Sequence, residues 1–379
     1  MVRRHHPISA LALMTALGAA GTAMAGETGT QAELDALRAR VEALEAGRAA
    51  AASGDLHIGR TAIDIYGYAK ADFFYDFDFV QGDTAFVNNI GEPANATDGT
   101  FGATVRQSRL GIRTRTETDI GTLGGQLEFD LFASGGRSEL RLRHANIRIG
   151  DHWLIGQSWT NFMPIGQYPT TVEFNGPVGI SFARVPQVRY THAFGKAVFS
   201  TSIEENSAPS NDPVVTAALE YNDDLFSARI AGLVGTVISG GTDVDQTGLT
   251  VSGALRPWHG GLFQATFATG EALGPLLIGR GAAAVGGVAN DVDGYTLEFR
   301  QDVGEKWNFG IAYGSEEYDL PTSTGTLDFT ELETIHLNAF YKPTDNLTLG
   351  AEYIFGERTT STGASFEGDR VQLAVQLNF

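Results

Sequence analysis

The feature that most constrains this chain is an alternation of apolar and polar residues with a period of two, which begins at residue 63 and recurs to the last residue. Between 63 and 77, the odd positions are apolar or small and most of the even positions are polar. This run is longer than an ordinary soluble strand of ~5–6 residues, and it exceeds the ~9–11 residues with which a tilted strand crosses a bilayer. The alternation returns in 123–133, 295–301, 347–355 and 370–379. The pattern therefore predicts long strands that turn one face to lipid, in preference to a soluble secreted sandwich.

Short polar turns alternate along the chain with longer loops. The seven short turns are 119–121, 151–152, 195–196, 223–224, 259–261, 304–306 and 344–346. The eight longer connections are 78–103, 134–138, 162–185, 206–212, 238–246, 271–292, 319–330 and 359–366. Short turns on one side and long loops on the other are typical of an outer-membrane barrel. We therefore expect an all-β fold, a transmembrane antiparallel β-barrel of about 16 strands over residues 63–379.

The physics of the bilayer explains why such a chain closes on itself. Inside lipid, every backbone N–H and C=O needs a partner within the protein, and only a closed sheet supplies one for every strand. About 16 strands enclose an aqueous lumen in place of a packed core. The polar face of each strand is therefore expected to line water.

The first 25 residues predict a secretory signal peptide. Arg3 and Arg4 form a basic start, residues 8–20 are apolar, and 23–25 form an A-x-A cleavage site. The alternative is a transmembrane anchor, for which the apolar run is too short. We expect an exported mature protein.

A short helical segment is predicted within residues 26–48. Leu34, Leu37, Val41 and Leu44 follow a heptad spacing, which is typical of a coiled coil. Two to three heptads are too short to be stable alone, so this helix must self-associate or dock onto the body of the protein. Residues 49–62 are expected to be a linker.

Composition excludes several classes of function. The net charge of −19 argues against a nucleic-acid partner, and the absence of cysteine excludes disulfides, thiolate metal sites and a cysteine nucleophile. The charge is uneven, because residues 104–194 hold 10 Lys/Arg and 7 Asp/Glu whereas 195–379 hold 9 and 25. The sequence contains no HExxH, G-x-S-x-G or Walker motif. We expect no metal, no cofactor and no enzymatic activity, although a barrel-borne lipid hydrolase with a Ser–His pair remains an alternative.

Arginines gather on the inward face of the predicted second strand, 105–115. Arg109, Arg113 and Arg115 share one face, and aliphatic residues occupy the other. An arginine facing lipid near the midplane would cost roughly 2–4 kcal/mol, so the three are expected to line the lumen. Arg189 is assigned inward for the same reason.

Three more arginines follow in the predicted fourth strand. Its aliphatic residues are at even positions at first (Leu140, Leu142) and at odd positions later (Ile147, Ile149). A bulge near 144–146 would place all of them on the same face. With that bulge, Arg141, Arg143 and Arg148 all face the lumen. Without it, Arg141 and Arg143 lie at the rim or in a subunit interface.

A row of guanidinium groups suits carboxylate and phosphate ligands, and rings of charge filter ions in pores. The inward arginines are therefore candidates for anion binding. The alternative is that they only neutralise inward acids such as Glu128 and Asp130.

Several segments together resemble outer-membrane porins, and most closely the DcaP-like trimeric outer-membrane transporter family. They are the strand start 63–70, the segments 106–111 (RQSRLG), 156–162 (GQSWTNF) and 174–179 (FNGPVG), and 186–191 (PQVRYT). The N-terminal heptads fit this family, and Phe379 at the end of an alternating strand looks like the signal read by the barrel-assembly machinery.

The resemblance implies a sixteen-stranded homotrimeric porin in the bacterial outer membrane, with its coiled coil in the periplasm. Its partners would be its own copies, outer-membrane lipids, the barrel-assembly machinery and small anionic solutes. It would let small hydrophilic solutes diffuse passively and favour small anions such as dicarboxylates. A general, non-selective porin is the alternative.

The resemblance also implies that segment 162–185 folds into the pore as a constriction loop. This segment carries Glu173 and Arg184. Glu173 is opposite in sign to the arginines, so a transverse field across the narrowest point is expected. The alternative is an outside loop or a latch between subunits.

Overall fold

The computed structural model describes residues 56–133 and 139–379. The predicted signal peptide, the predicted coiled coil and residues 49–55 of the linker lie outside the described residues. The chain divides into two compact units, Met1–His57 and Ile58–Phe379, and the barrel belongs to the second. Within the described residues, no helix is long and apolar enough to cross a membrane.

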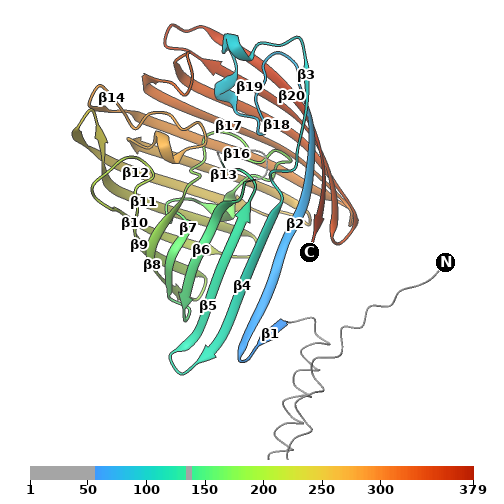
Figure 1. The fold of residues 1–379 in the computed structure, drawn as a ribbon, viewed down its shortest axis with the longest axis vertical. Coiled ribbons are helices and arrows are strands. Elements are labelled where there is room, and N and C mark those ends of the chain that lie inside the picture. The colour runs from blue at the N-terminus through green and yellow to red at the C-terminus, as the bar shows by residue number, and fades with distance from the viewer. Residues whose placement is uncertain (1–55, 134–138) are drawn as a thin grey trace, which may run out of the picture. The chain divides into compact units, whose positions relative to one another are not determined.

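The described chain is built from strands joined by turns and loops, with four short 3-10 helices (Figure 1). The strands are β1 (Leu56–Ile58), β2 (Thr61–Asp76), β3 (Thr100–Thr104), β4 (Arg109–Thr118), β5 (Gly121–Asp130), β6 (Arg141–Ile149), β7 (Trp153–Trp159), β8 (Arg184–Phe194), β9 (Ala197–Glu204), β10 (Val214–Asn222), β11 (Phe226–Ser239), β12 (Thr242–Leu255), β13 (Gly261–Glu271), β14 (Ala284–Val285), β15 (Val288–Ala289), β16 (Asp291–Val303), β17 (Trp307–Thr322), β18 (Phe329–Thr344), β19 (Leu347–Thr359) and β20 (Ser365–Asn378). The 3-10 helices are η1 (Val87–Asn89), η2 (Pro93–Asn95), η3 (Ile165–Gln167) and η4 (Gly274–Leu276).

The large sheet closes into an antiparallel barrel. Strand β2 pairs with β20 on one side and with β3 and β4 on the other, so the first and last strands of the barrel meet. Strands β3 and β4 form one interrupted strand, and β1 adds only three residues. The 18 strands of this sheet therefore make sixteen continuous strands of the barrel wall, or staves. The predicted sixteen-stranded all-β barrel is confirmed. Strands β14 and β15 form a separate small hairpin.

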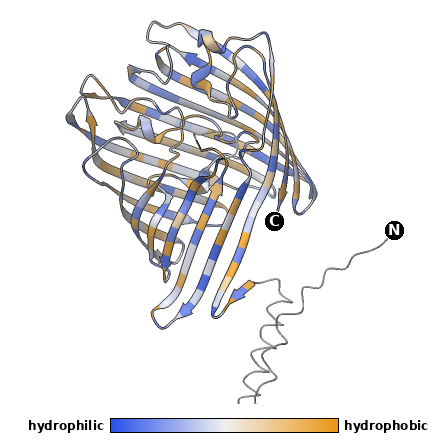
Figure 2. Ribbon diagram, viewed as in Figure 1, coloured by the Kyte–Doolittle hydropathy of each residue, from blue (hydrophilic) through white to orange (hydrophobic). Residues whose placement is uncertain are grey.

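Hydrophilic and hydrophobic residues alternate along the staves (Figure 2), as the sequence predicts. In β20, Leu373 and Val375 are exposed on the outer surface, whereas Gln372 and Ala374, which alternate with them, are buried. The outward apolar residues contact lipid in a membrane, and the inward polar residues meet the lumen. At the end of β20, Phe379 exchanges two backbone hydrogen bonds of 3.1 Å with Gly67 of β2 and leaves its ring exposed. Recognition of this residue by the assembly machinery stays a prediction.

One predicted loop is wrong. Segment 238–246 was expected to be a long connection, but β11 and β12 run through most of it and are joined by Gly240 and Gly241 alone. Both glycines have positive φ, 60° and 83°, which is the conformation of the tightest hairpin turns. Because polar residues also occur in strands that extend beyond the membrane, their presence in this segment did not indicate a loop.

Three loops fold inward and pack on one another. They are 77–99, 160–183 and 272–290. Ile90, Phe162 and Leu277 each come from a different loop and are almost completely buried, in one cluster with the inward Leu332 of β18. This apolar packing fills part of the lumen and leaves the remaining space beside other staves.

The first of these loops is also held by a charged contact. Glu92 accepts the backbone N–H groups of Thr326 and Leu327, each at 3.0 Å, and forms an ion pair of 2.9 Å with Arg358. Burial alone would raise the pKa of Glu92, but these hydrogen bonds together lower it to about 2. Glu92 therefore stays ionised and ties loop 77–99 to β19 and to the loop between β17 and β18.

The seam where β2 meets β20 contains a fully buried ion pair. Arg370 donates to both carboxylate oxygens of Asp76, at 2.6 and 2.9 Å, and also to the carbonyl of Gly82 at 2.7 Å. Neither charged side chain is exposed. The pair joins the first stave, the last stave and loop 77–99.

Replacing Asp76 with alanine should destabilise the barrel by about 3–5 kcal/mol, because Arg370 would be left as an unpaired buried charge. Heat-dependent loss of the compact, fast-migrating band on a detergent gel measures the effect. Asp78→Ala is the matched control, since Asp78 is two residues away and exposed. If the two variants melt at the same temperature, the seam pair does not stabilise closure.

Candidate functional site: an arginine-lined cavity in the lumen

A cavity of about 600 Å³ lies in the lumen against β4–β7. Its charged lining consists of Arg109, Arg113, Arg143, Arg148 and one carboxylate, Glu128. The opposite side is apolar and comes mainly from the loop between β7 and β8. The apolar and aromatic residues there are Trp159, Met163, Ile165, Tyr168, Phe174 and Phe182. The space that the packed loops leave open is therefore positively charged on one side and apolar on the other.

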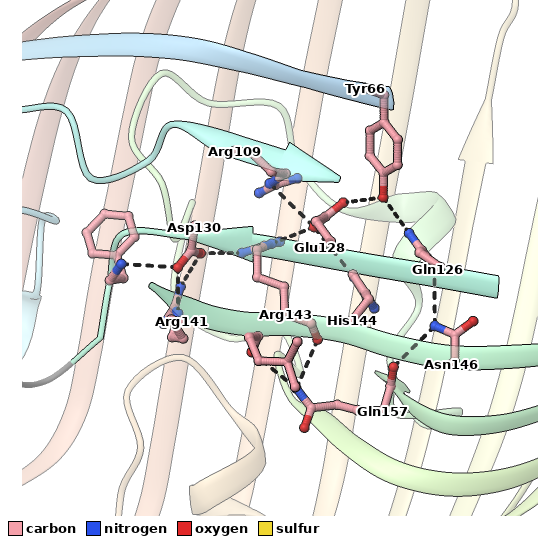
Figure 3. A network of polar contacts seen from close by, with 12 residues as sticks. Tyr66, Arg109, Gln126, Glu128, Asp130, Arg141, Arg143, His144, Asn146 and Gln157 are labelled. Atoms are coloured by element: carbon pink, nitrogen blue, oxygen red, sulfur yellow. Dashed lines mark hydrogen bonds and ion pairs between the residues drawn. The ribbon is translucent and has the colours of Figure 1, made fainter. Parts of the chain in front are cut away.

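Glu128 is the hub of the polar network at this cavity (Figure 3). Arg143 donates to its carboxylate at 2.7 Å, the Arg109 guanidinium lies at 3.5 Å, and the Tyr66 hydroxyl donates at 2.9 Å. Gln126 in turn donates to the Tyr66 oxygen at 2.7 Å. Arg109 and Arg143 are thus both held by the carboxylate of Glu128.

Asp130 holds the arginines of β6. Arg141 binds it with two hydrogen bonds of 2.9 and 2.6 Å, and Arg143 adds a third of 2.9 Å. Both arginines reach the lumen because β6 contains a bulge: Glu128 pairs with His144, whereas the next residue pairs with Leu142. The extra residue is Arg143, at the edge of the segment where the parity of the sequence changes.

Two arginines of the cavity are less constrained. Arg113 is about half exposed, lies 3.6 Å from Asp64 and stacks 3.7 Å above the Tyr66 ring. Arg148 is exposed and forms no ion pair or hydrogen bond with the part of the chain that the structure describes. These two guanidinium groups are the ones that a solute in the cavity can reach most directly.

The remaining predicted arginines lie outside the cavity. Arg115 pairs with Glu117 at 2.9 Å near a turn, with both side chains mostly exposed. Arg189 donates to Gln187 at 2.8 Å and to the carbonyl oxygen of Trp159, so it supports the start of the loop between β7 and β8.

Arg184 was expected in the constriction loop, but it is the first residue of β8. Its guanidinium lies 4.7 Å from the Trp159 ring, and its buried Nη1 has no hydrogen-bond partner among the described residues. The loop itself spans 160–183, so it begins and ends two residues before the predicted segment 162–185.

The expected role of Glu173 is wrong. Its carboxylate is buried and accepts the backbone N–H groups of Ala85 (3.0 Å), Asn175 (2.6 Å) and Gly176 (2.9 Å). Burial raises the pKa of Glu173. Because it joins two loops and does not line the cavity, it presents no free negative charge to the arginines.

Three inward glutamates of the far wall, β16–β19, hold the loop in the lumen. The backbone donors and their acceptors are Thr170 to Glu298 (3.0 Å), Val172 to Glu352 (2.6 Å) and Gly179 to Glu316 (2.9 Å). Sequence analysis did not single out these residues for this role. The alternation of these strands does place the three glutamates on the inward face. A carboxylate that is buried there needs hydrogen-bond donors, and this could have indicated a contact with an inward loop.

Aromatic rings of the loop also contact the arginines. Phe174 lies 5.6 Å from the Arg141 guanidinium and 5.8 Å from that of Arg143, and it packs on Phe132 at 4.7 Å. These cation–π contacts join the loop to the arginine wall. The loop therefore bridges the two sides of the barrel, with glutamates at one end and arginines at the other.

Solved structures with this architecture are outer-membrane proteins, among them a channel and a porin. The outer membrane channel DcaP of Acinetobacter baumannii matches with a TM-score of 0.78 and 23% identity, over 85% of this chain and 99% of that one. OmpT of Vibrio cholerae matches with a TM-score of 0.60 and 16% identity, over 86% and 99%. The anion-selective porin from Comamonas acidovorans matches with a TM-score of 0.59 and 14% identity, over 84% and 100%. The fold is thus that of the outer-membrane porins and channels.

A sequence model of the DcaP outer membrane protein family matches residues 32–249, which is more than half of the chain. The chain therefore belongs to the DcaP outer membrane protein family, and the predicted resemblance is confirmed. The comparison with curated protein sequences gave no match.

Replacing Glu352 with alanine should loosen the loop between β7 and β8. The Val172 N–H would lose its acceptor, which costs about 1–3 kcal/mol for a buried donor. We expect a larger and noisier single-channel conductance in planar bilayers. Glu352→Gln should have a smaller effect, because its one amide oxygen can still accept from Val172 while its NH2 group faces Glu173 and His336. Glu357→Ala, on the outward face of the same strand, is the control. Unchanged conductance in Glu352→Ala would show that this contact does not hold the loop.

Proposed function

We propose that this protein is an outer-membrane porin that lets small hydrophilic solutes diffuse passively and favours small anions such as dicarboxylates. The observation that carries the proposal is the lining of the lumenal cavity, in which four arginines face one carboxylate. Two of the four, Arg113 and Arg148, are exposed to the cavity. A channel whose lumen presents this excess of positive charge attracts anions.

The net charge of −19 does not oppose this proposal, because the acids of the far wall are engaged elsewhere. Glu298, Glu316 and Glu352 each accept backbone N–H groups of the inward loops. The loop lies between these carboxylates and the cavity. Exposed charges farther away than a Debye length of about 8–10 Å are largely screened at physiological salt. Local charge at the cavity therefore outweighs the total.

A dicarboxylate fits this arrangement of cations. One carboxylate can bind Arg113 and the other Arg148, with charge-assisted hydrogen bonds that are each worth about 1.5–3 kcal/mol before desolvation. Arg109 and Arg143 add positive potential without being free to move, because Glu128 holds both. Net binding stays weak enough for release, since tight binding would block the channel.

We propose further that the protein is a homotrimer, with the predicted coiled coil in the periplasm. Heptads as short as those in 26–48 need partner helices. An even number of staves returns both ends of the barrel to the side of the short turns, which is the periplasmic side in outer-membrane barrels. The N-terminal segment is then placed where three copies can associate.

Replacing both Arg113 and Arg148 with alanine should shift the reversal potential in a KCl gradient toward cation preference. Arg109→Ala added to this pair should shift it further. Uptake of a dicarboxylate into proteoliposomes should slow, while uptake of a neutral sugar should change little, because only the charged solute loses its attraction. Arg115→Ala is the matched control, since Arg115 lies on the same strand but outside the cavity.

Two results would contradict the proposal. A wild-type channel that prefers K⁺ over Cl⁻ would show that the acidic half determines selectivity. Equal effects of Arg115→Ala and the Arg113 and Arg148 pair would indicate a general, non-selective porin. Hydrolysis of added lipid by the purified protein would instead favour the barrel-borne enzyme.

Deleting residues 31–48 should weaken the trimer without closing the pore. Mass measurement in mild detergent should change from a trimer toward a monomer, and channel conductance per subunit should persist because the barrel is intact. A monomer with the segment present would refute the role of the heptads.

A further inference from the structure

The ring of Trp159 forms a corner of the lumenal cavity at which guanidinium and imidazole groups gather. The Arg184 guanidinium lies 4.7 Å from the centre of this ring, the Arg143 guanidinium 5.7 Å and the His144 ring 5.7 Å. Arg143 and His144 line the cavity together with Trp159. Phe182 also lines it and packs against the Trp159 ring at 5.0 Å. We call this place the Trp159 corner.

Two nitrogen atoms at the Trp159 corner lack the hydrogen-bond partner that a buried polar atom normally has. They are Nη1 of Arg184 and Nδ1 of His144, which are buried and without a partner among the described residues. The His144 side chain is only 8% exposed, and its other ring nitrogen lies 3.9 Å from Glu128, too far for a hydrogen bond. Within the described part of the chain, Arg184 forms no hydrogen bond or ion pair, and its guanidinium lies beside the rings of Trp159 and Phe182. The corner therefore has a guanidinium and an imidazole with unused hydrogen-bonding capacity.

The two inward carboxylates of β5 do not supply the missing partner, because other arginines already hold them. Glu128 accepts a hydrogen bond from Arg143 and forms an ion pair with Arg109. Asp130 accepts two hydrogen bonds from Arg141 and one from Arg143. Three arginines thus share two negative charges, and the further guanidinium at the corner has none. A desolvated cation without a counter-charge is costly, and contact with aromatic rings offsets only part of that cost. An anion from solution would complete the group.

The lining of the corner determines which kind of anion is stable there. Apart from the guanidinium and imidazole groups, the wall is apolar and consists of Trp159, Phe182, Met163 and Ile165. Apolar groups cannot replace the water that an anion loses on entering, so the anion bears the cost of its own dehydration. The guanidinium group is itself weakly hydrated, which makes it a suitable partner for an anion that has lost water. Of two anions with the same charge, the one that holds its water less tightly is favoured.

We propose that the Trp159 corner selects among anions by their hydration, and that Arg184 is the specificity-determining residue. The class of solute favoured is the weakly hydrated anion, with thiocyanate as its probe and chloride as the more strongly hydrated reference. This inference rests on the proposed function, because it concerns anions that Arg113 and Arg148 have attracted into the cavity. Those two exposed arginines determine the preference for anions over cations, whereas Arg184 determines the preference for one anion over another.

The test measures reversal potentials of the full-length protein in planar bilayers, with potassium chloride on one side and potassium thiocyanate on the other. The two anions carry the same charge and have similar mobilities in water. The wild type should be about threefold more permeable to thiocyanate than to chloride. Arg184→Met removes the charge and keeps an apolar chain, so it should bring the permeability ratio close to the ratio of the mobilities. In a KCl gradient, the same variant should still prefer Cl⁻ over K⁺, because Arg113 and Arg148 remain.

Arg113→Met is the matched variant, since it also removes one guanidinium, but from the more exposed part of the cavity. It should weaken the preference for Cl⁻ over K⁺ and leave the ratio of thiocyanate to chloride permeability unchanged. Equal loss of that ratio in Arg113→Met and Arg184→Met would overturn the inference, because any lumenal charge would then suffice. A merely structural Arg184 would also overturn it: Arg184→Met would melt at a lower temperature, and its conducting channels would keep the wild-type ratio.

Measurements on the wild type alone decide the matter if Arg184→Met does not fold. A permeability that falls from thiocyanate through nitrate and chloride to fluoride, as hydration becomes stronger, would support the inference. A wild type that prefers Cl⁻ over K⁺ but passes these anions in proportion to their mobilities would overturn it and leave the proposed function intact. A wild type that prefers K⁺ over Cl⁻ would contradict the proposed function and this inference together.

Discussion

Closure of the sheet is the constraint on which the rest of this structure depends. Strands in lipid must pair on both edges, and β2 meets this requirement by pairing with β20 on one side and β4 on the other. Closure in turn fixes which side chains face inward. A buried ion pair also joins the two strands at the seam, because Asp76 lies on β2 and Arg370 on β20.

Inside the closed barrel, charge is divided between two walls. The acids of β16–β19 accept backbone N–H groups of the loop between β7 and β8, as Glu352 does for Val172. The arginines of β4 and β6 meet that loop from the other side, where Phe174 stacks near Arg143. The loop is therefore held by carboxylates and faces guanidinium groups. This division explains how a strongly acidic chain encloses a positively charged cavity.

The sequence was informative wherever structure follows from neighbouring residues. Alternation and the spacing of turns predicted the sixteen staves, and the resemblance of several short segments predicted the family. A change in parity predicted a bulge in β6, which the structure places at Arg143. Contacts between distant parts of the chain could not be predicted, since Val172 and Glu352 are 180 residues apart in the sequence. Glu173 was misassigned for that reason. The sequence shows its negative charge, but it does not show the three backbone N–H groups that the carboxylate accepts. The tight turn at Gly240 and Gly241 was missed because polar residues also occur in strands beyond the membrane.

The central claim is that the charge lining the lumenal cavity, and not the total charge, determines which ions pass. The most direct test is the reversal potential of the wild-type channel in a KCl gradient, measured at low and at high mean salt. Our account predicts a preference for Cl⁻ that weakens as salt rises, because screening shortens the reach of Arg113 and Arg148. A preference for K⁺ at low salt would contradict the account.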